Sequence, residues 1–210
     1  MTLILASTSP RRRELLALLG IPFNVKVPSF EERLVVDCPA IEQVQSFAQG
    51  KAQSVARQEP AAIVLGSDTV IELNHHVLGK PDDLAEARAM LRRLAGRDHY
   101  VRTAVALVCS ARAIDVVALS TAIVRMKPFD ERRHERYLAT GESLGKAGAY
   151  SIHGEGGDLV DSIDGDFPTV VGLPLRLIAQ LFMQAGVSVP VDLDELYAIK
   201  PYANWARFSA

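Results

Sequence analysis

The chain has 210 residues, of which 49% are hydrophobic and 23% charged, so it can bury a sizeable core and is unlike a disordered protein. A formal net charge of −2 gives no general attraction to polyanions, which argues against a nucleic-acid-binding protein. The two cysteines form no CxxC pair, which excludes a disulfide scaffold and favours a reducing compartment. Without a signal peptide or a run of roughly 20 apolar residues, we expect a soluble, cytoplasmic protein with no membrane partner.

Strand-like and helix-like segments alternate along the chain, which predicts an α/β fold with helices covering a central sheet. A buried strand at 3–6 precedes Ser9-Pro10, which fit the N-cap and first residue of a helix that ends at Gly20. A second strand is predicted over 23–27. Apolar residues at helical spacing over 41–55 predict a second, longer helix.

The middle of the chain is predicted to be rich in strands. Residues 62–73 are mostly β, and Asn74-His75 occupy an expected hairpin turn before a third helix capped by Asp82 or Asp83. This helix has its apolar stripe at Leu84, Ala87, Leu91 and Leu94. The remaining predicted elements are strands at 99–109 and 114–124, a short helix at 130–138, glycine-rich loops over 141–157, a hairpin near 164–165 and a helix over 175–185.

Three consecutive arginines, Arg11, Arg12 and Arg13, occupy the first turn of the first predicted helix. The helix dipole already makes that end positive, so cations there are unfavourable for folding alone. An anion bound there would meet free amide groups and guanidinium forks together, which predicts a phosphate site. The alternatives are a solvated charge run or contact with RNA or DNA, and the latter is disfavoured because no aromatic residues interleave with the arginines.

Lys51 lies on the apolar stripe of the second predicted helix, four residues from both Phe47 and Val55. A lysine in that position needs an explanation. Either its chain extends past its neighbours to water, or it delivers an ammonium group to an anion in a cleft. The sequence pattern leaves both explanations open.

Asp68 follows an apolar strand and the residues Gly66 and Ser67, and apolar residues resume after it. A carboxylate that interrupts apolar pairing in an α/β sheet is a candidate functional group, and Gly66 would allow a substrate or another backbone to approach closely. The alternative is a β-bulge in which Asp68 accepts hydrogen bonds from nearby amides.

Glu31 and Glu32 lie on a predicted loop and could share a divalent cation with Asp68, because hard cations bind carboxylate oxygens. Ordinary surface acids are the alternative. Lys80, between Gly79 and Pro81, either reaches a phosphate or is exposed. The chain has no GxxxxGK[ST], GxSxG or HExxH motif, which excludes a P-loop, a hydrolase nucleophile elbow and a zincin site.

Five short motifs occur in an order that is similar to one known family. They are Ser7-Thr8-Ser9-Pro10-Arg11-Arg12, Gly66-Ser67-Asp68-Thr69, Gly79-Lys80-Pro81, Ala147-Gly148-Ala149-Tyr150 and Val171-Gly172-Leu173-Pro174. The chain therefore resembles the Maf-like nucleoside triphosphate pyrophosphatases, also named septum formation inhibitors. The resemblance predicts a Maf-like domain over 1–186 and leaves 187–210 as a C-terminal extension of unknown role.

The resemblance implies an elongated, two-lobed fold like that of inosine triphosphatase, with a mixed central sheet flanked by helices and a cleft between the lobes. It also implies a homodimer and a magnesium or manganese cofactor. Asp68 would be the catalytic proton acceptor, and Glu32 would bind the metal with it. The residues implied to bind the triphosphate are Ser7, Arg11, Arg12, Lys51 and Lys80.

Three positions are implied to select the base: Arg11, Thr69 and His153. Arg11 and Thr69 match the branch that acts on dTTP and UTP, and Arg11 differs from the tryptophan of the branch that acts on 7-methyl-GTP. Where the dTTP/UTP branch has Ile-Gln-Gly, this chain has Ile152-His153-Gly154. An imidazole cannot offer the paired donor and acceptor of an amide, so the resemblance leaves the preferred base open.

The expected reaction is hydrolysis of a nucleoside triphosphate to its monophosphate and pyrophosphate, with dTTP, UTP or modified pyrimidine nucleotides as candidate substrates. Such an activity would keep modified nucleotides out of nucleic acids and would link the protein to arrest of cell division. The alternative is a regulator of septum formation that binds nucleotides without hydrolysing them.

Overall fold

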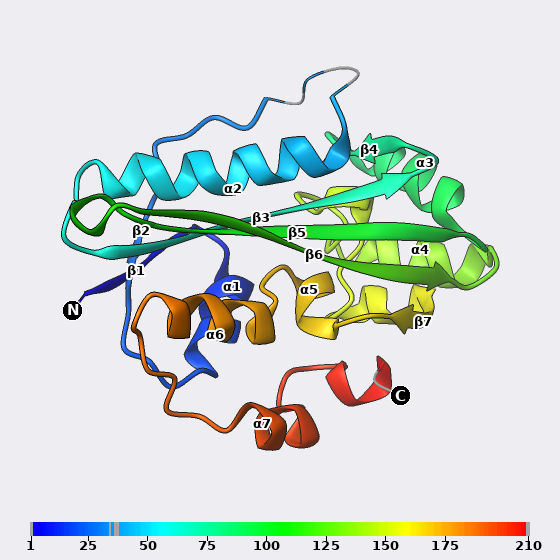
Figure 1. Cartoon of the computed structure of the whole chain (residues 1–210). Helices are drawn as coiled ribbons and strands as arrows, with labels where there is room; N and C mark the ends of the chain where they lie inside the picture. The colour runs from blue at the N-terminus through cyan, green and yellow to red at the C-terminus, as the bar shows by residue number, and fades with distance from the viewer. Residues whose placement is uncertain (1, 34, 36–37, 209–210) are drawn as a thin grey trace. The chain divides into compact units, whose positions relative to one another are not determined.

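The computed structural model describes residues 2–33, 35 and 38–208 (Figure 1). Its centre is a seven-stranded sheet in the order β2-β1-β3-β5-β6-β7, with β4 paired to β3. The strands are β1 (Leu3–Ala6), β2 (Asn24–Lys26), β3 (Ile63–Leu73), β4 (His76–Leu78), β5 (Asp98–Cys109), β6 (Ile114–Met126) and β7 (Val160–Asp164). Because β1 pairs in parallel with β2 and β3 while β3–β4 and β6–β7 are antiparallel, the sheet is mixed. The predicted α/β class with a mixed sheet is confirmed.

The chain divides into two compact units. The first unit comprises Met1–Thr69, Thr103–Ser120 and Gly172–Ile199, and the second comprises Val70–Arg102, Thr121–Val171 and Lys200–Ala210. Strands β3, β5 and β6 contribute residues to both units. The segment after residue 186 is divided between the units at residue 199. The elongated outline and the cleft between lobes stay predictions.

In the first unit, helices cover both faces of the parallel strands (Figure 1). Helix α2 (Ala40–Ala56) lies on one face, and α1 (Pro10–Ala17) and α6 (Leu175–Gln184) lie on the other. All four residues of β1 are buried, which explains why this strand is apolar throughout rather than alternating. The short helix α7 (Leu193–Ile199) contacts α6 through an ion pair of 2.9 Å between Arg176 and Asp194.

In the second unit, the β3–β4 hairpin turns at Asn74 and His75, which both have positive φ, as a tight hairpin turn requires. Helices α3 (Leu84–Leu94) and α4 (Glu131–Ala139) contact each other. Asp83 and Asp130 cap their first turns by accepting hydrogen bonds from backbone amides. The unit also contains the short helix α5 (Phe167–Val171). Within the described residues, no helix is long and apolar enough to cross a membrane.

Several predicted features are wrong in detail. Residues 164–165 do not form a hairpin, because the chain passes from β7 directly into α5. Leu84 does not belong to the buried stripe of α3, since 44% of its surface is exposed. Helix α7 and the 3-10 turn η4 (Trp205–Phe208) were not predicted, because the apolar pattern weakens after residue 187.

Candidate active site

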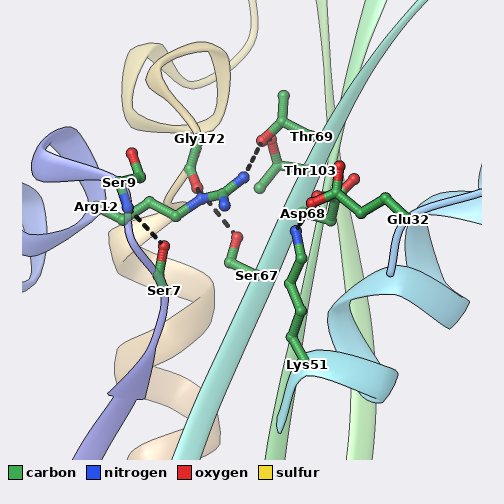
Figure 2. Close-up of polar contacts among 10 residues, drawn as sticks. All are labelled: Ser7, Ser9, Arg12, Glu32, Lys51, Ser67, Asp68, Thr69, Thr103 and Gly172. Carbon is green, nitrogen blue, oxygen red and sulfur yellow. Dashed lines mark hydrogen bonds and ion pairs between the residues drawn. The ribbon is translucent and has the colours of Figure 1, made fainter. Parts of the chain in front are cut away.

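The first unit collects most of the candidate side chains around the end of β1 and the middle of β3 (Figure 2). Strand β1 pairs with β3 as far as Ala6 and Gly66. Asp68 therefore lies two residues past the carboxyl end of β1, on a strand that continues. Strand β3 runs without a break over Ile63–Leu73, which confirms the predicted β segment over 62–73, so Asp68 interrupts the apolar pattern but not the strand. The functional edge of the sheet is created by the end of β1, not by the end of β3.

Gly66 brings helix α2 against strand β3. A side-chain carbon at Gly66 would overlap the Ala48 carbonyl and the backbone of Ala52. The second of the two predicted reasons for this glycine, the close approach of another backbone, is therefore confirmed. Because Lys51 lies between these two contact points on α2, its side chain extends directly toward Asp68 (Figure 2).

The Lys51 ammonium group lies between two carboxylates. Its Nζ atom is 2.5 Å from Asp68 Oδ1 and 2.5 Å from Glu32 Oε1. Both Lys51 and Asp68 are only 6% exposed, so the explanation in which the lysine extends to water is wrong. A buried lysine paired with the buried Asp68 and the more exposed Glu32 is an electrostatic group of the site and not part of the apolar stripe.

Phe30, two residues before Glu32, contacts helix α2 at two positions. Phe30 packs against Phe47 of α2, with 6.2 Å between ring centroids. The Phe30 ring also covers Gly50, where any side-chain carbon would overlap it. Glycine inside a helix costs about 1 kcal/mol relative to alanine, so Gly50 is explained by the ring that it accommodates. These contacts place Phe30 against α2, two residues before Glu32.

Arg12 connects helix α1 to β3 and to Gly172, which lies between α5 and α6. Its Nε atom donates to the Gly172 carbonyl at 3.0 Å, and its Nη2 atom donates to Thr69 Oγ1 at 3.2 Å. Ser67 donates to the same carbonyl at 3.0 Å. Thr69 Oγ1 also lies 2.9 Å from Thr103 Oγ1. Arg12 and Thr69, which were predicted to have separate roles in phosphate binding and base selection, thus contact each other.

Ser7 lies at the turn between β1 and α1. Its buried hydroxyl accepts a hydrogen bond from the Ser9 amide at 3.1 Å. Ser9 has the extended backbone of an N-cap, but its side chain makes no capping hydrogen bond, so the predicted side-chain cap is absent. The half-buried Arg11 is in the first turn of α1, next to Arg12.

The site changes the acidity of its central carboxyl group. Burial raises the pKa of Asp68, and the positive charges of Lys51 and Arg12 oppose this rise. Burial also lowers the pKa of Arg12, while Asp68 and Glu32 oppose that shift. Both groups are therefore partly withdrawn from water and within electrostatic reach of each other, which is typical of functional sites.

The comparisons with known proteins agree with the resemblance. The family profile described as "Maf-like protein" matches residues 2–185. The chain belongs to the Maf-like family. A dTTP/UTP pyrophosphatase of Symbiobacterium thermophilum is 48% identical over 188 residues, covering 89% of this chain and 95% of that protein. One from Thermotoga maritima is 43% identical and covers 89% of this chain and 90% of that protein.

The Staphylococcus aureus Ham1 structure matches 60% of this Maf-like chain and 72% of its own, with a TM-score of 0.43 and 14% identity. A likeness at this level carries no argument about function.

Two predicted site residues of this Maf-like chain, Lys80 and His153, lie in the second unit. Their roles in phosphate binding and base selection stay predictions. Three residues in the site were not predicted as candidates: Ser67, Thr103 and Gly172. Ser67 and Thr103 are fully buried polar side chains, but a strand sequence alone does not distinguish them from ordinary strand threonines and serines. Gly172 contributes its carbonyl, which no side-chain pattern reveals.

Proposed function

We propose that this chain hydrolyses a nucleoside triphosphate to the monophosphate and pyrophosphate. The observation that carries the proposal is the buried Asp68 carboxylate in contact with Lys51 and near Arg12, in a chain of the Maf-like family. Its relatives are named dTTP/UTP pyrophosphatases, so dTTP and UTP are the first substrates to test. Nothing supports the alternative of a nucleotide-binding regulator without hydrolytic activity.

Asp68 is the proposed proton acceptor for the attacking water. The water oxygen forms a bond to the α-phosphorus, the bond from that phosphorus to the β-phosphate oxygen breaks, and pyrophosphate leaves. The proton lost by the water passes to the Asp68 carboxylate. Because burial raises the pKa of Asp68, this group accepts a proton more readily than an exposed aspartate would.

Ser7, Arg11, Arg12, Lys51 and Lys80 are the proposed triphosphate-binding residues. The arginines support this assignment because they lie at the positive end of α1, where an anion is favourable. Lys51 already neutralises two acids, so its proposed contribution is to let a polyanion approach Asp68 without strong repulsion. Phosphoryl transfer is promoted mainly by positioning and charge stabilisation of this kind.

Glu32 and Asp68 are the proposed ligands of a magnesium or manganese ion. Their carboxylate oxygens already converge on one cationic group, the Lys51 ammonium, and hard oxygen donors suit these metals. Within the described residues, no group of three or more His, Cys, Asp or Glu side chains could hold a metal ion. Two protein carboxylates plus substrate phosphates and water is the arrangement that magnesium prefers. When bound, the ion would neutralise phosphate charge.

Arg11, Thr69 and His153 keep their proposed roles in base selection. Thr69 is held by Arg12 and Thr103, so its hydroxyl has a fixed position. His153 occupies the position where the resemblance implies an amide side chain, and this difference makes a different ranking of pyrimidine substrates the specific expectation for this chain. We also propose a cytoplasmic homodimer, and the two free cysteines fit a reducing compartment.

Hydrolysis in water enriched in ¹⁸O tests the reaction directly. The full chain is incubated with dTTP, UTP, CTP, ATP or GTP and with magnesium or manganese. The products are then separated, and their masses are measured by mass spectrometry. Attack at the α-phosphorus places the label in the monophosphate and leaves pyrophosphate unlabelled. Label in pyrophosphate, or formation of diphosphate and orthophosphate, would contradict the proposed reaction. Tight binding without any product would identify a nucleotide-binding protein instead.

A further inference from the structure

The end of the chain, beyond the residues that match the Maf-like family, packs firmly within the second unit. Trp205 is only 1% exposed and stacks on Phe167, with 6.0 Å between ring centroids and an interplanar angle of 12°. Phe208 stacks on the same ring at 6.3 Å. An ion pair of 2.9 Å joins Arg207 to Asp158. We call residues 202–208 the C-terminal strap.

Asn204 of the strap contacts the backbone on both sides of His153. Its Nδ2 atom donates to the Ile152 carbonyl at 2.9 Å and to the Gly154 carbonyl at 3.0 Å. An amide nitrogen has two hydrogens, so one side chain satisfies both carbonyls. Asn204 has a φ of +63°, a left-handed conformation that asparagine tolerates better than most residues. Gly157 leaves room for this amide, since a side-chain carbon there would lie 2.8 Å from Asn204 Nδ2.

The His153 ring also has neighbours on its own loop and on the strap. Ser151 Oγ lies 3.1 Å from His153 Nδ1, and the ring of Tyr202 lies 5.9 Å from the histidine ring between centroids. Across the loop, the Glu155 amide donates to the Glu142 carboxylate at 3.1 Å. The half-buried His153 therefore lies in a turn whose backbone is hydrogen-bonded both by Asn204 of the strap and by Glu142.

We propose that the C-terminal strap is a specificity element and that Asn204 is a positioning residue for His153. The Ile152 carbonyl belongs to the peptide that enters His153, and the Gly154 carbonyl belongs to the peptide that follows Gly154. Holding both carbonyls on one side chain fixes the ends of this short turn and so restricts where the His153 ring can point. A group that discriminates between bases by hydrogen bonding needs a defined position, because a misplaced donor loses its selectivity. This inference rests on the proposed function, since it assumes that His153 faces the base of a nucleotide substrate.

The variant Asn204→Gly tests the strap without straining its backbone, because glycine tolerates the positive φ of this position. The matched control is Phe208→Leu, which weakens the stacking on Phe167 and leaves the Asn204 amide in place. Two quantities are measured on the full chain. The first is amide hydrogen exchange over residues 152–157. The second is the ratio of kcat/KM values between dTTP, UTP and CTP.

We expect Asn204→Gly to accelerate exchange at Gly154 and Gly157 and to change the ratios between bases by about 3- to 10-fold, the effect of one or two hydrogen bonds. Phe208→Leu should leave the ratios within about 2-fold of the parent chain. Unchanged exchange in Asn204→Gly would overturn the positioning role. Faster exchange with unchanged base ratios would overturn the specificity role. If the parent chain releases no pyrophosphate, the proposed function fails, whereas the exchange measurement still decides whether Asn204 holds the turn.

Discussion

Lys51 Nζ lies 2.5 Å from Asp68 Oδ1, and both side chains are almost fully buried. The pair joins helix α2 to strand β3 near Gly66, which has no side chain to keep the two elements apart. A buried ion pair is weak evidence for stability, because desolvation offsets much of the attraction between the charges. Its place beside Arg12 and Glu32 points instead to a role in chemistry.

Replacing Asp68 with asparagine removes the proposed proton acceptor and keeps the shape of the side chain. We expect kcat to fall by about 10²- to 10⁴-fold, the usual contribution of a general base, while nucleotide binding changes little. Steady-state kinetics and equilibrium binding of a non-hydrolysable triphosphate measure the two effects. A variant with a near-normal rate would show that another group accepts the proton.

The pH profile gives a second test of Asp68. The ionised carboxylate is the active form, so activity should be lost as the pH falls through the pKa of Asp68. Because burial raises this pKa, the loss should occur at a higher pH than for an exposed aspartate. Measuring kcat/KM from pH 4 to 9 locates this acid limb, which should be missing from the residual activity of Asp68→Asn.

Replacing Lys51 with methionine removes the ammonium that opposes the rise in the pKa of Asp68. We expect the acid limb to move to higher pH and kcat/KM to fall at least about tenfold, since a charge-assisted contact contributes about 1.5–3 kcal/mol. The control Lys51→Arg keeps the charge and should retain a less shifted profile. Kinetics equal to those of the parent chain would indicate that Lys51 has only a structural role.

Replacing Gly50 with alanine tests whether Phe30 positions Glu32. Alanine favours a helix by about 1 kcal/mol over glycine, but here its methyl group would displace the Phe30 ring. We therefore expect weaker manganese binding and lower kcat/KM without the usual gain in the free energy of unfolding. The control is Gln49→Ala, whose side chain contacts Asp115 at 2.8 Å. Equal manganese affinities in the two variants would exclude the proposed path from Gly50 to Glu32.

Replacing Arg12 with lysine keeps a positive charge but cannot reproduce two contacts from one guanidinium group. The Gly172 carbonyl and the Thr69 hydroxyl would no longer share one donor side chain. We expect the free energy of unfolding to fall by about 1–2 kcal/mol and base selectivity to weaken through Thr69. Denaturant unfolding and the ratios of kcat/KM between bases measure these effects. The control is Thr103→Val, which removes the other hydroxyl group that contacts Thr69.

His99 gives a prediction about stability that is independent of the active site. Burial lowers its pKa from 6.5 to about 4, and its Nε2 atom lies 2.8 Å from the Tyr150 hydroxyl. Between these pH values the unfolded chain binds a proton that the folded chain does not, so stability decreases as the pH falls from 6.5 toward 4. The full loss is about 3 kcal/mol. Denaturant unfolding across this range should show a smaller loss for His99→Gln.

The sequence was most informative where a residue conflicts with its local pattern. Lys51 on an apolar stripe and arginines at the start of a helix both disagree with local preference. In the structure, Lys51 contacts Asp68 and Arg12 contacts the next residue, Thr69. Strands and helices with regular apolar spacing were also predicted with nearly correct bounds, because burial on one face imposes that spacing.

Features that depend on long-range packing could not be predicted. The pairing of Phe30 with Gly50 joins a loop to a helix, and although a glycine inside a helix is unusual, nothing in the sequence names Phe30 as its partner. Asn204 is one polar residue in a segment without a periodic pattern, and its importance comes from two carbonyls about 50 positions earlier. A single sequence has no signal for such pairs, because each partner has acceptable local alternatives.

Trp205 is the one tryptophan of the chain, and it lies in the C-terminal strap against Phe167. Its fluorescence should therefore report the state of this segment and of few other regions. A red shift of the emission at a denaturant concentration that leaves the helical circular dichroism intact would reveal detachment of the strap before global unfolding.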